Sequence, residues 1–397
     1  MLNLAKNMKK LLILVVIAFL MFTASTKESL AANWIHPIFA VEQAYDDNVF
    51  LTDTDKKSDS VTTIFTGVTL EPQLSEHELA VTYVADQQYF ANNSSQNTVN
   101  HNVDAEATLH FNEWRVELSD SFRHFENRTG SEDTARIKRT SNAADVKIIY
   151  AFNKLDVGIN YAHRLENYRS DLAIGSFLGQ ALTYQDLDSN ENSGEIETAF
   201  HFWPKTSVLF SGRYGALDHD TGKKSDSDYF DILTGLRGQL TAKGTIEGKI
   251  GYRNQEYDNS AGDFNSVIFH VAFVENFTER DTLTIDIDRT THDTIYKGNA
   301  YFKSTLVSGE YAHGFTDKVT GTINGSYRLN KYPVATTEGT KTVKREDDFW
   351  TIGADLSYEL PKWGEIALAY TYGQRASTFD TFDYDNNLVS LGVTVEF

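Results

Sequence analysis

Apolar and polar residues alternate one by one along most of the sequence. In residues 283–288, leucine or isoleucine occupies every second position, and threonine or aspartate stands between them. The same period of two runs through residues 155–162, 319–328 and 391–397. Because successive side chains of a β-strand point to opposite faces, this alternation predicts strands that have one apolar and one polar face.

Strands of this kind fill the chain after residue 31 and leave little sequence for other structure. We expect about eighteen strands, with about sixteen as the alternative count. They are predicted to begin near residues 38, 61, 78, 100, 114, 140, 155, 189, 206, 226, 244, 264, 281, 299, 318, 346, 363 and 384.

The predicted connections alternate between short and long. The short ones are residues 112–113, 153–154, 204–205, 241–243, 278–280, 316–317 and 361–362. The long ones, rich in Asp, Asn, Ser, Thr and Gly, are residues 46–60, 91–99, 128–139, 170–188, 216–225, 333–345 and 378–383. Tight turns on one side and longer loops on the other are typical of transmembrane barrels. The sequence therefore predicts an all-β fold, a transmembrane antiparallel up-and-down β-barrel.

Large aromatic residues lie beside the predicted short turns, and only on that side. Aromatic rings are favoured at a membrane interface, where an apolar ring meets lipid and its polar edge meets water. The alternative is a soluble core, which also collects aromatic residues near turns. The residues concerned are Trp114, Phe152, Trp203, Phe277, Phe315 and Trp363.

The N-terminal segment has the layout of a secretory signal peptide. Lys6, Lys9 and Lys10 precede an apolar run at residues 11–22, and a small-x-small site ends at Ala31. The run is shorter than the roughly 20 apolar residues that a spanning helix needs. We expect residues 1–31 to be the signal peptide and residues 32–397 the barrel, with an N-terminal membrane anchor as the alternative.

Composition narrows the possible functions. The formal net charge is -20, which argues against nucleic-acid binding because that function needs a basic surface. The chain has no cysteine, so it is neither a lipoprotein nor a disulfide-bonded or thiol-dependent protein. Mean hydropathy is -0.39 while aromatic residues make up 13% of the chain. These values fit a barrel with one wet face, although they also fit a soluble acidic β-protein.

The last predicted strand ends on Phe397. An alternating apolar strand that ends in phenylalanine resembles the C-terminal assembly signal of outer-membrane proteins. The resemblance implies that the barrel-assembly machinery is a partner, and that the chain is located in the outer membrane of a Gram-negative bacterium, among outer-membrane lipid and lipopolysaccharide.

Two segments carry a resemblance to a known family. They are residues 42–50 (EQAYDDNVF), which precede a strand at 60–71, and residues 382–393 (FDYDNNLVSLGV). Together they resemble the outer-membrane proteins grouped as putative β-barrel porin 2. That family is commonly linked to exopolysaccharide operons, which implies periplasmic polysaccharide-export proteins as possible partners. It has no catalytic motif, so the resemblance supplies no site residues.

Five arginines occupy inward-facing positions on their predicted strands. Each lies a similar number of residues beyond a predicted short turn. We expect them to line the outward half of the lumen, where a basic ring selects anions. The alternative is a structural lattice, since Asp156, Asp231, Glu247, Asp286, Asp288 and Asp355 share that face. The five candidate solute-binding residues are Arg123, Arg164, Arg213, Arg253 and Arg328.

The sequence carries no complete motif for metal binding or catalysis. Asp186, Asp188, Asn190 and Glu197 have the spacing of a calcium loop, but Glu191 occupies the position of its essential glycine. The eleven histidines are scattered and form no motif. We therefore expect no metal, no cofactor and no enzyme activity. A passive channel for exopolysaccharide or another polar solute is the main hypothesis. A surface adhesin or receptor, a barrel without conduction, and an outer-membrane lipase or protease are the alternatives.

Overall fold

The computed structural model describes most of the chain after residue 33. The described residues are 34–72, 74–128, 132, 135–177, 180–258, 262–294, 296, 298–361 and 364–396. The predicted signal peptide, Trp363 and Phe397 lie outside them. Among the described residues, no helix has both the length and the apolar character that a membrane crossing requires.

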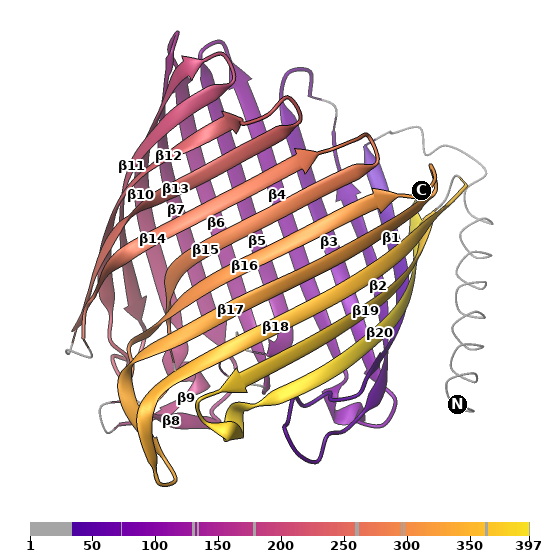
Figure 1. Ribbon diagram of the computed structural model, residues 1–397, viewed down its shortest axis with the longest axis vertical. Coiled ribbons are helices and arrows are strands. Elements are labelled where there is room, and N and C mark those ends of the chain that lie inside the picture. Colours follow the sequence, from indigo (N-terminus) through magenta and orange to yellow (C-terminus); the bar gives the residue numbers. More distant parts are fainter. Residues whose placement is uncertain are drawn as a thin grey trace.

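Eighteen antiparallel strands form one closed sheet (Figure 1). Each strand pairs with the next along the barrel, β7 pairs with β10, and β20 pairs with β1 to close the wall. The strands are β1 (Ile35–Asp46), β2 (Asp59–Leu70), β3 (Glu78–Phe90), β4 (Thr98–Phe111), β5 (Trp114–Arg128), β6 (Arg136–Ala151), β7 (Leu155–Tyr168), β10 (Ser189–Trp203), β11 (Thr206–His219), β12 (Ser227–Gln239), β13 (Gly244–Tyr257), β14 (Phe264–Asn276), β15 (Asp281–Asp293), β16 (Tyr301–Gly314), β17 (Val319–Glu338), β18 (Lys341–Leu360), β19 (Gly364–Ser377) and β20 (Tyr384–Glu396).

The predicted barrel with eighteen strands is confirmed, and the smaller count is wrong. One predicted long loop, residues 333–345, is also wrong. There β17 and β18 keep pairing and leave only a two-residue turn, after a register shift between Lys331 and Ala335. Threonine and valine favour continued strand, and Gly339 takes the left-handed conformation (φ 59°) that the turn requires.

The longest predicted loop, residues 170–188, contains structure of its own. It holds a small hairpin of β8 (Ala173–Phe177) and β9 (Gln180–Thr183), followed by a 3-10 turn at Tyr184–Leu187. This hairpin lies at the end of the barrel opposite the C-terminus (Figure 1). We call that end the long-loop end, and the end that carries the C-terminus the short-turn end.

The outer face of the wall is apolar and the inner face is polar. Ile250 and Ile323 point outward and are 54% and 63% exposed, whereas Asp231 points inward and is fully buried. Exposed aromatic residues follow the short-turn end, as predicted, at Trp114, Phe152, Trp203, Phe277 and Phe315. This arrangement is the one that a surrounding bilayer favours.

A second set of outward aromatic residues lies nearer the long-loop end, where the sequence predicted none. These tyrosines mark the other edge of the apolar band, because each hydroxyl donates to a polar group on the neighbouring strand. The pairs are Tyr161 with Asn192 (2.7 Å), Tyr214 with Asp228 (2.8 Å), Tyr370 with Asn387 (2.8 Å) and Tyr327 with Asp348. Two aromatic girdles therefore flank the band.

The first prediction concerns topology. A single cysteine placed at Thr340, in the β17–β18 turn, should be labelled by a membrane-impermeant maleimide on whole cells, because this turn lies at the long-loop end. A cysteine at Lys205, in a short turn, should be labelled only after the outer membrane is opened. Because the chain has no cysteine of its own, no background labelling is expected. The reverse pattern would refute the orientation.

The second prediction concerns the lipid-facing surface. Ile323→Arg should lower the free energy of unfolding by about 2–4 kcal/mol if the position lies near the bilayer midplane. The neighbouring change Asn324→Arg should have little effect, because Asn324 faces the lumen and bonds there to Asp355. Urea unfolding in phospholipid vesicles measures both. Equal losses at the two positions would show that the two faces are wrongly assigned.

Candidate functional site

The inner wall of the barrel carries cations and carboxylates in bonded groups. Glu197 on β10 is the centre of one group, where it contacts Lys249 and lies 3.2 Å from Arg237 and 3.8 Å from Lys147. Arg237 also binds Glu247 at 2.8 Å. These five residues come from β6, β10, β12 and β13, so the group ties neighbouring and next-nearest strands together across the inner surface.

All five arginines predicted to line the lumen lie on inward-facing positions. Arg123 makes a bidentate pair with Asp104 at 2.7 and 2.9 Å. Arg164 lies 3.6 Å from Asp145. Both carboxylates sit on the strand next to the arginine. A guanidinium that is bonded in this way has less positive charge to offer a passing solute.

Arg213 and Arg253 are brought together by one shared carboxylate. Asp231 accepts hydrogen bonds from Arg213 at 2.5 and 2.8 Å and from Arg253 at 2.8 and 2.9 Å. The ring of Tyr229 lies beside both guanidinium groups, at 5.7 and 4.3 Å. Two cations around one fully buried carboxylate form a rigid link between β11, β12 and β13.

Arg328 differs from the other four. Its guanidinium lies 6.0 Å from the centre of the Phe349 ring. Within the described part of the chain, no carboxylate lies within ion-pair distance of it. Arg328 is thus the one predicted lumen arginine without a carboxylate partner in the described residues. Anion selection by the five residues as a ring stays a prediction.

The long-loop end of the β15–β16 hairpin folds inward onto the wall. Thr291 accepts a hydrogen bond from Arg253 and donates one to Gln255, each at 3.0 Å, and both partners are lumen-facing residues of β13. Tyr301 stacks on Tyr257 with 5.4 Å between ring centres. We call residues 291–302 the inner hairpin. Sequence analysis missed it, because its inward bend depends on contacts with other strands.

The tip of the inner hairpin reaches loops on other sides of the barrel. Asp293 binds Lys224 at 3.1 Å and His219 at 3.2 Å, both near the β11–β12 loop. Thr294 donates to the Glu132 carboxylate, which comes from the β5–β6 loop. The Glu132 carbonyl in turn accepts a hydrogen bond from Arg375 on β19, at 3.4 Å. These contacts join opposite walls across the lumen.

A buried ion pair on β18, surrounded by aromatic rings, contacts the tip of the inner hairpin. Arg345 and Asp347 on β18 bond at 2.7–3.0 Å and are both fully buried. The Arg345 guanidinium lies over the rings of Tyr296, Tyr332 and Phe382, at 4.5, 4.9 and 3.7 Å. A charge desolvated this fully is tolerated only with such partners. The contact anchors the inner hairpin through Tyr296.

The β8–β9 hairpin also turns into the lumen. Leu182 is 1% exposed and packs with Tyr257, Phe264 and Tyr301, residues of β13, β14 and β16. Asp186 holds the following turn, since it accepts hydrogen bonds from the Thr183 backbone at 2.8 Å and from Lys223 at 3.0 Å.

Burial of Asp186 acts to raise the pKa of its carboxyl, but the hydrogen bonds from Thr183 and Lys223 outweigh it, and the pKa lies below its usual value. The link therefore stabilises the fold at neutral pH, and this contribution is lost as pH falls through the lowered pKa.

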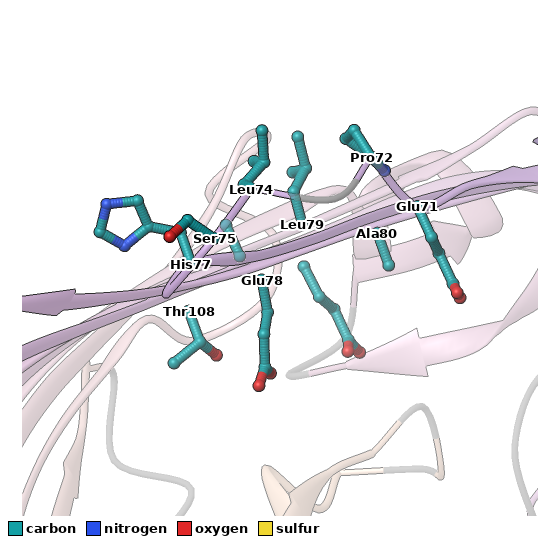
Figure 2. A pocket seen from close by; sticks show the side chains of 11 residues that line it. Glu71, Pro72, Leu74, Ser75, His77, Glu78, Leu79, Ala80 and Thr108 are labelled. Atoms are coloured by element: carbon teal, nitrogen blue, oxygen red, sulfur yellow. The ribbon is translucent and has the colours of Figure 1, made fainter. Parts of the chain in front are cut away.

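Exposed carboxylates lie on one side of the short-turn end. A pocket of about 590 Å³ lies beside the β2–β3 turn and the ends of β3 and β4. In Figure 2, Glu71 and Glu78 point to one side of the sheet, and Leu74 and Leu79 point to the other. Glu106, cross-strand from Ala80, lines the same pocket. The lumen therefore runs from exposed carboxylates at one end to arginines and a constriction at the other.

Residues that suggested calcium binding do not meet. Glu197 binds Lys249 and Asp186 binds Lys223, while Asp188 accepts the Tyr168 amide at 2.6 Å. In the described ranges, no group of three or more His, Cys, Asp or Glu has the geometry of a metal site.

A serine, a histidine and an aspartate do meet inside the wall. His201 lies 2.8 Å from Ser207 Oγ and 2.9 Å from Asp156. A hydrolase also needs an accessible nucleophile and free backbone N–H donors beside it. Ser207 is only 5% exposed, and its strand is paired on both sides. The three residues therefore tie β7, β10 and β11 together.

The third prediction tests the shared carboxylate. Asp231→Ala leaves the buried Arg253 and the half-buried Arg213 without their shared carboxylate, which should lower the free energy of unfolding by about 3–5 kcal/mol. Asp355→Ala is the matched control, because Asp355 also faces the lumen but bonds only to the Asn324 amide in the described residues. Urea unfolding in vesicles measures both variants. A loss at Asp231 no larger than that at Asp355 would contradict a stabilising lattice.

Comparison with known proteins gives one family and a set of barrels. The model of a family described as putative beta-barrel porin 2 matches residues 33–397. No curated protein matches the chain.

Solved structures with a similar fold include three bacterial barrels. OccAB3 of Acinetobacter baumannii is 10% identical, with 91% of this chain and 99% of that chain covered and a TM-score of 0.46. The outer membrane protein OpdK of Pseudomonas aeruginosa is 11% identical, with coverages of 91% and 99% and a TM-score of 0.48. OpdO of the same species is 11% identical, with coverages of 92% and 98% and a TM-score of 0.49.

Proposed function

The chain belongs to the putative beta-barrel porin 2 family, and from that premise we propose that it is a passive outer-membrane channel for a saccharide polymer. Residues 1–31 are proposed to direct export and to be removed. The long-loop end then faces the cell exterior and the short-turn end faces the periplasm.

The observation that carries this proposal is the contrast between the two halves of the lumen. The periplasmic half presents exposed polar groups such as Glu78 and Glu106, which can replace part of a solute's hydration. The exterior half is narrowed by the inner hairpin and by the β8–β9 hairpin. A wet entrance followed by a constriction is the arrangement expected of a channel that admits one chain at a time.

The charges favour a neutral polymer over an acidic one. Glu71, Glu78 and Glu106 lie on one side of the periplasmic entrance, and carboxylates repel anions at short range. Four of the five predicted arginines pair with three carboxylates, so most but not all of their charge is balanced. Hydroxyl groups of a neutral saccharide can bond to both kinds of group. We therefore propose export of a neutral exopolysaccharide, delivered to the acidic entrance by periplasmic export proteins.

A surface receptor or adhesin is the second candidate. It is favoured by the dense packing of the loops at the exterior end, where Arg345, Asp347, Asn299 and Asn330 are all fully buried. A receptor needs such a rigid surface and no open lumen, so conductance separates the two functions.

The fourth prediction tests conduction and the constriction together. Replacing residues 294–300 by a short glycine linker should raise the single-channel conductance in planar bilayers several-fold, because the tip of the inner hairpin is removed from the lumen. Neutral oligosaccharides added on the periplasmic side should block the current of both the native and the shortened chain. Acidic oligosaccharides of the same length should block it less.

The control shortens residues 91–97, a loop of equal length between β3 and β4, and should leave conductance unchanged. Equal conductance of all three proteins would show that the inner hairpin does not limit the channel. If none of them conducts, the receptor function is favoured.

A further inference from the structure

Three lysines lie together on the outward face of the barrel, at the long-loop end of β16–β18. Lys303 occupies an outward-facing position of β16, like Val307. Lys331 and Lys344 occupy outward-facing positions, like Tyr327 and Trp350. We call Lys303, Lys331 and Lys344 the outer basic patch.

The outer basic patch begins just beyond the apolar band. Ile323, which is 63% exposed, lies within the band, and Tyr327 marks the girdle at its edge. Lys331 follows four residues later on the same face, at roughly 3.3 Å per residue along a tilted strand. This places the patch at the level where lipid headgroups meet water.

Like charges are held close together in this patch. Lys303 and Lys331 are direct cross-strand partners in the β16–β17 ladder. The charges of Arg289, Lys331 and Lys344 all repel that of Lys303. Like charges opposite each other destabilise a sheet. Glu346, at 3.3 Å from Lys331, is the carboxylate that pairs with the patch in the described residues. The patch therefore retains an excess of positive charge.

The outward positions at the same level of β11, β12 and β13 are acidic. Asp218, Asp228 and Glu256 occupy them, near the long-loop ends of these strands. Outward cations also lie side by side near the long-loop ends of β6 and β7, at Lys138 and Arg169.

We propose that the outer basic patch binds the phosphate groups of an outer-leaflet glycolipid, the lipid A part of lipopolysaccharide. The inference rests on the proposed outer-membrane location. Phosphate oxygens accept strong hydrogen bonds from guanidinium and ammonium groups, and lipid A places its phosphates at the level of the patch. The bound lipid would relieve the repulsion between Lys303 and Lys331.

The fifth prediction is tested on the purified full chain in detergent micelles. Native mass spectrometry should detect binding of lipid A that carries both phosphates, and much weaker binding of lipid A from which they have been removed. The combined variant Lys303→Gln, Lys331→Gln, Lys344→Gln should bind phosphorylated lipid A at least about tenfold more weakly, given about 1 kcal/mol for each lysine near an anionic surface.

The matched control removes three exposed lysines at the short-turn end: Lys154→Gln, Lys205→Gln and Lys318→Gln. It makes the same change of net charge and should leave binding unaltered. Equal affinity of the two triple variants would overturn the proposed site. Heat-modifiable mobility shows whether the patch variant folds. If it does not fold, the test is the binding of the two forms of lipid A to the native chain, and equal affinity for both would overturn the proposal.

Membrane fractionation separates this inference from the proposed function. If the native chain is absent from the outer-membrane fraction, the channel proposal fails, and the patch proposal fails with it. If the chain is present there but binds without regard to phosphate, only the lipid site fails.

Discussion

Backbone hydrogen bonding is the constraint on which this structure depends. In a lipid environment, each peptide N–H or C=O without a partner is unfavourable by several kcal/mol, so a sheet cannot leave an edge open. Pairing of β20 with β1 removes both edges at once. Because the backbone is then satisfied by the wall alone, the side chains are free to differ between its two faces. The outer face can be apolar, and the inner face can carry charges.

Closure also creates a space that the strands' own side chains do not fill. A barrel of this many strands is wide enough to leave an aqueous channel. The chain reduces this space at one end by turning the inner hairpin and the β8–β9 hairpin inward. Their contacts involve buried charges, such as Arg345 with Asp347, that are stable only because each has an opposite charge and aromatic rings around it. The constriction is therefore held by specific polar contacts as well as by apolar packing.

The resulting barrel is asymmetric along its axis. Carboxylates dominate the end near Glu78 and Glu106, and bonded arginines such as Arg253 dominate the other half, next to the constriction. On the outside, the outer basic patch lies beyond the apolar band, on β16–β18. Each of these features suits a channel oriented in an asymmetric membrane, where one mouth receives a polymer and the other is surrounded by phosphorylated glycolipid.

The sequence alone determined the wall of this protein, and the tertiary structure decided what fills it. Strand number, face assignment and the aromatic residues beside the short turns follow from a period of two, which every strand obeys independently of its neighbours. The inward bend of the inner hairpin depends on contacts with other strands, so no local pattern predicts it. Residues 333–345 were wrongly predicted as a loop. Partnerships such as Arg213 and Arg253 with Asp231 depend on which strands become neighbours and how far each side chain reaches. The hydrogen bond between Arg375 and Glu132 joins residues 243 positions apart. Such contacts arise only when closure of the barrel brings opposite walls within reach, and no local alternation encodes that distance.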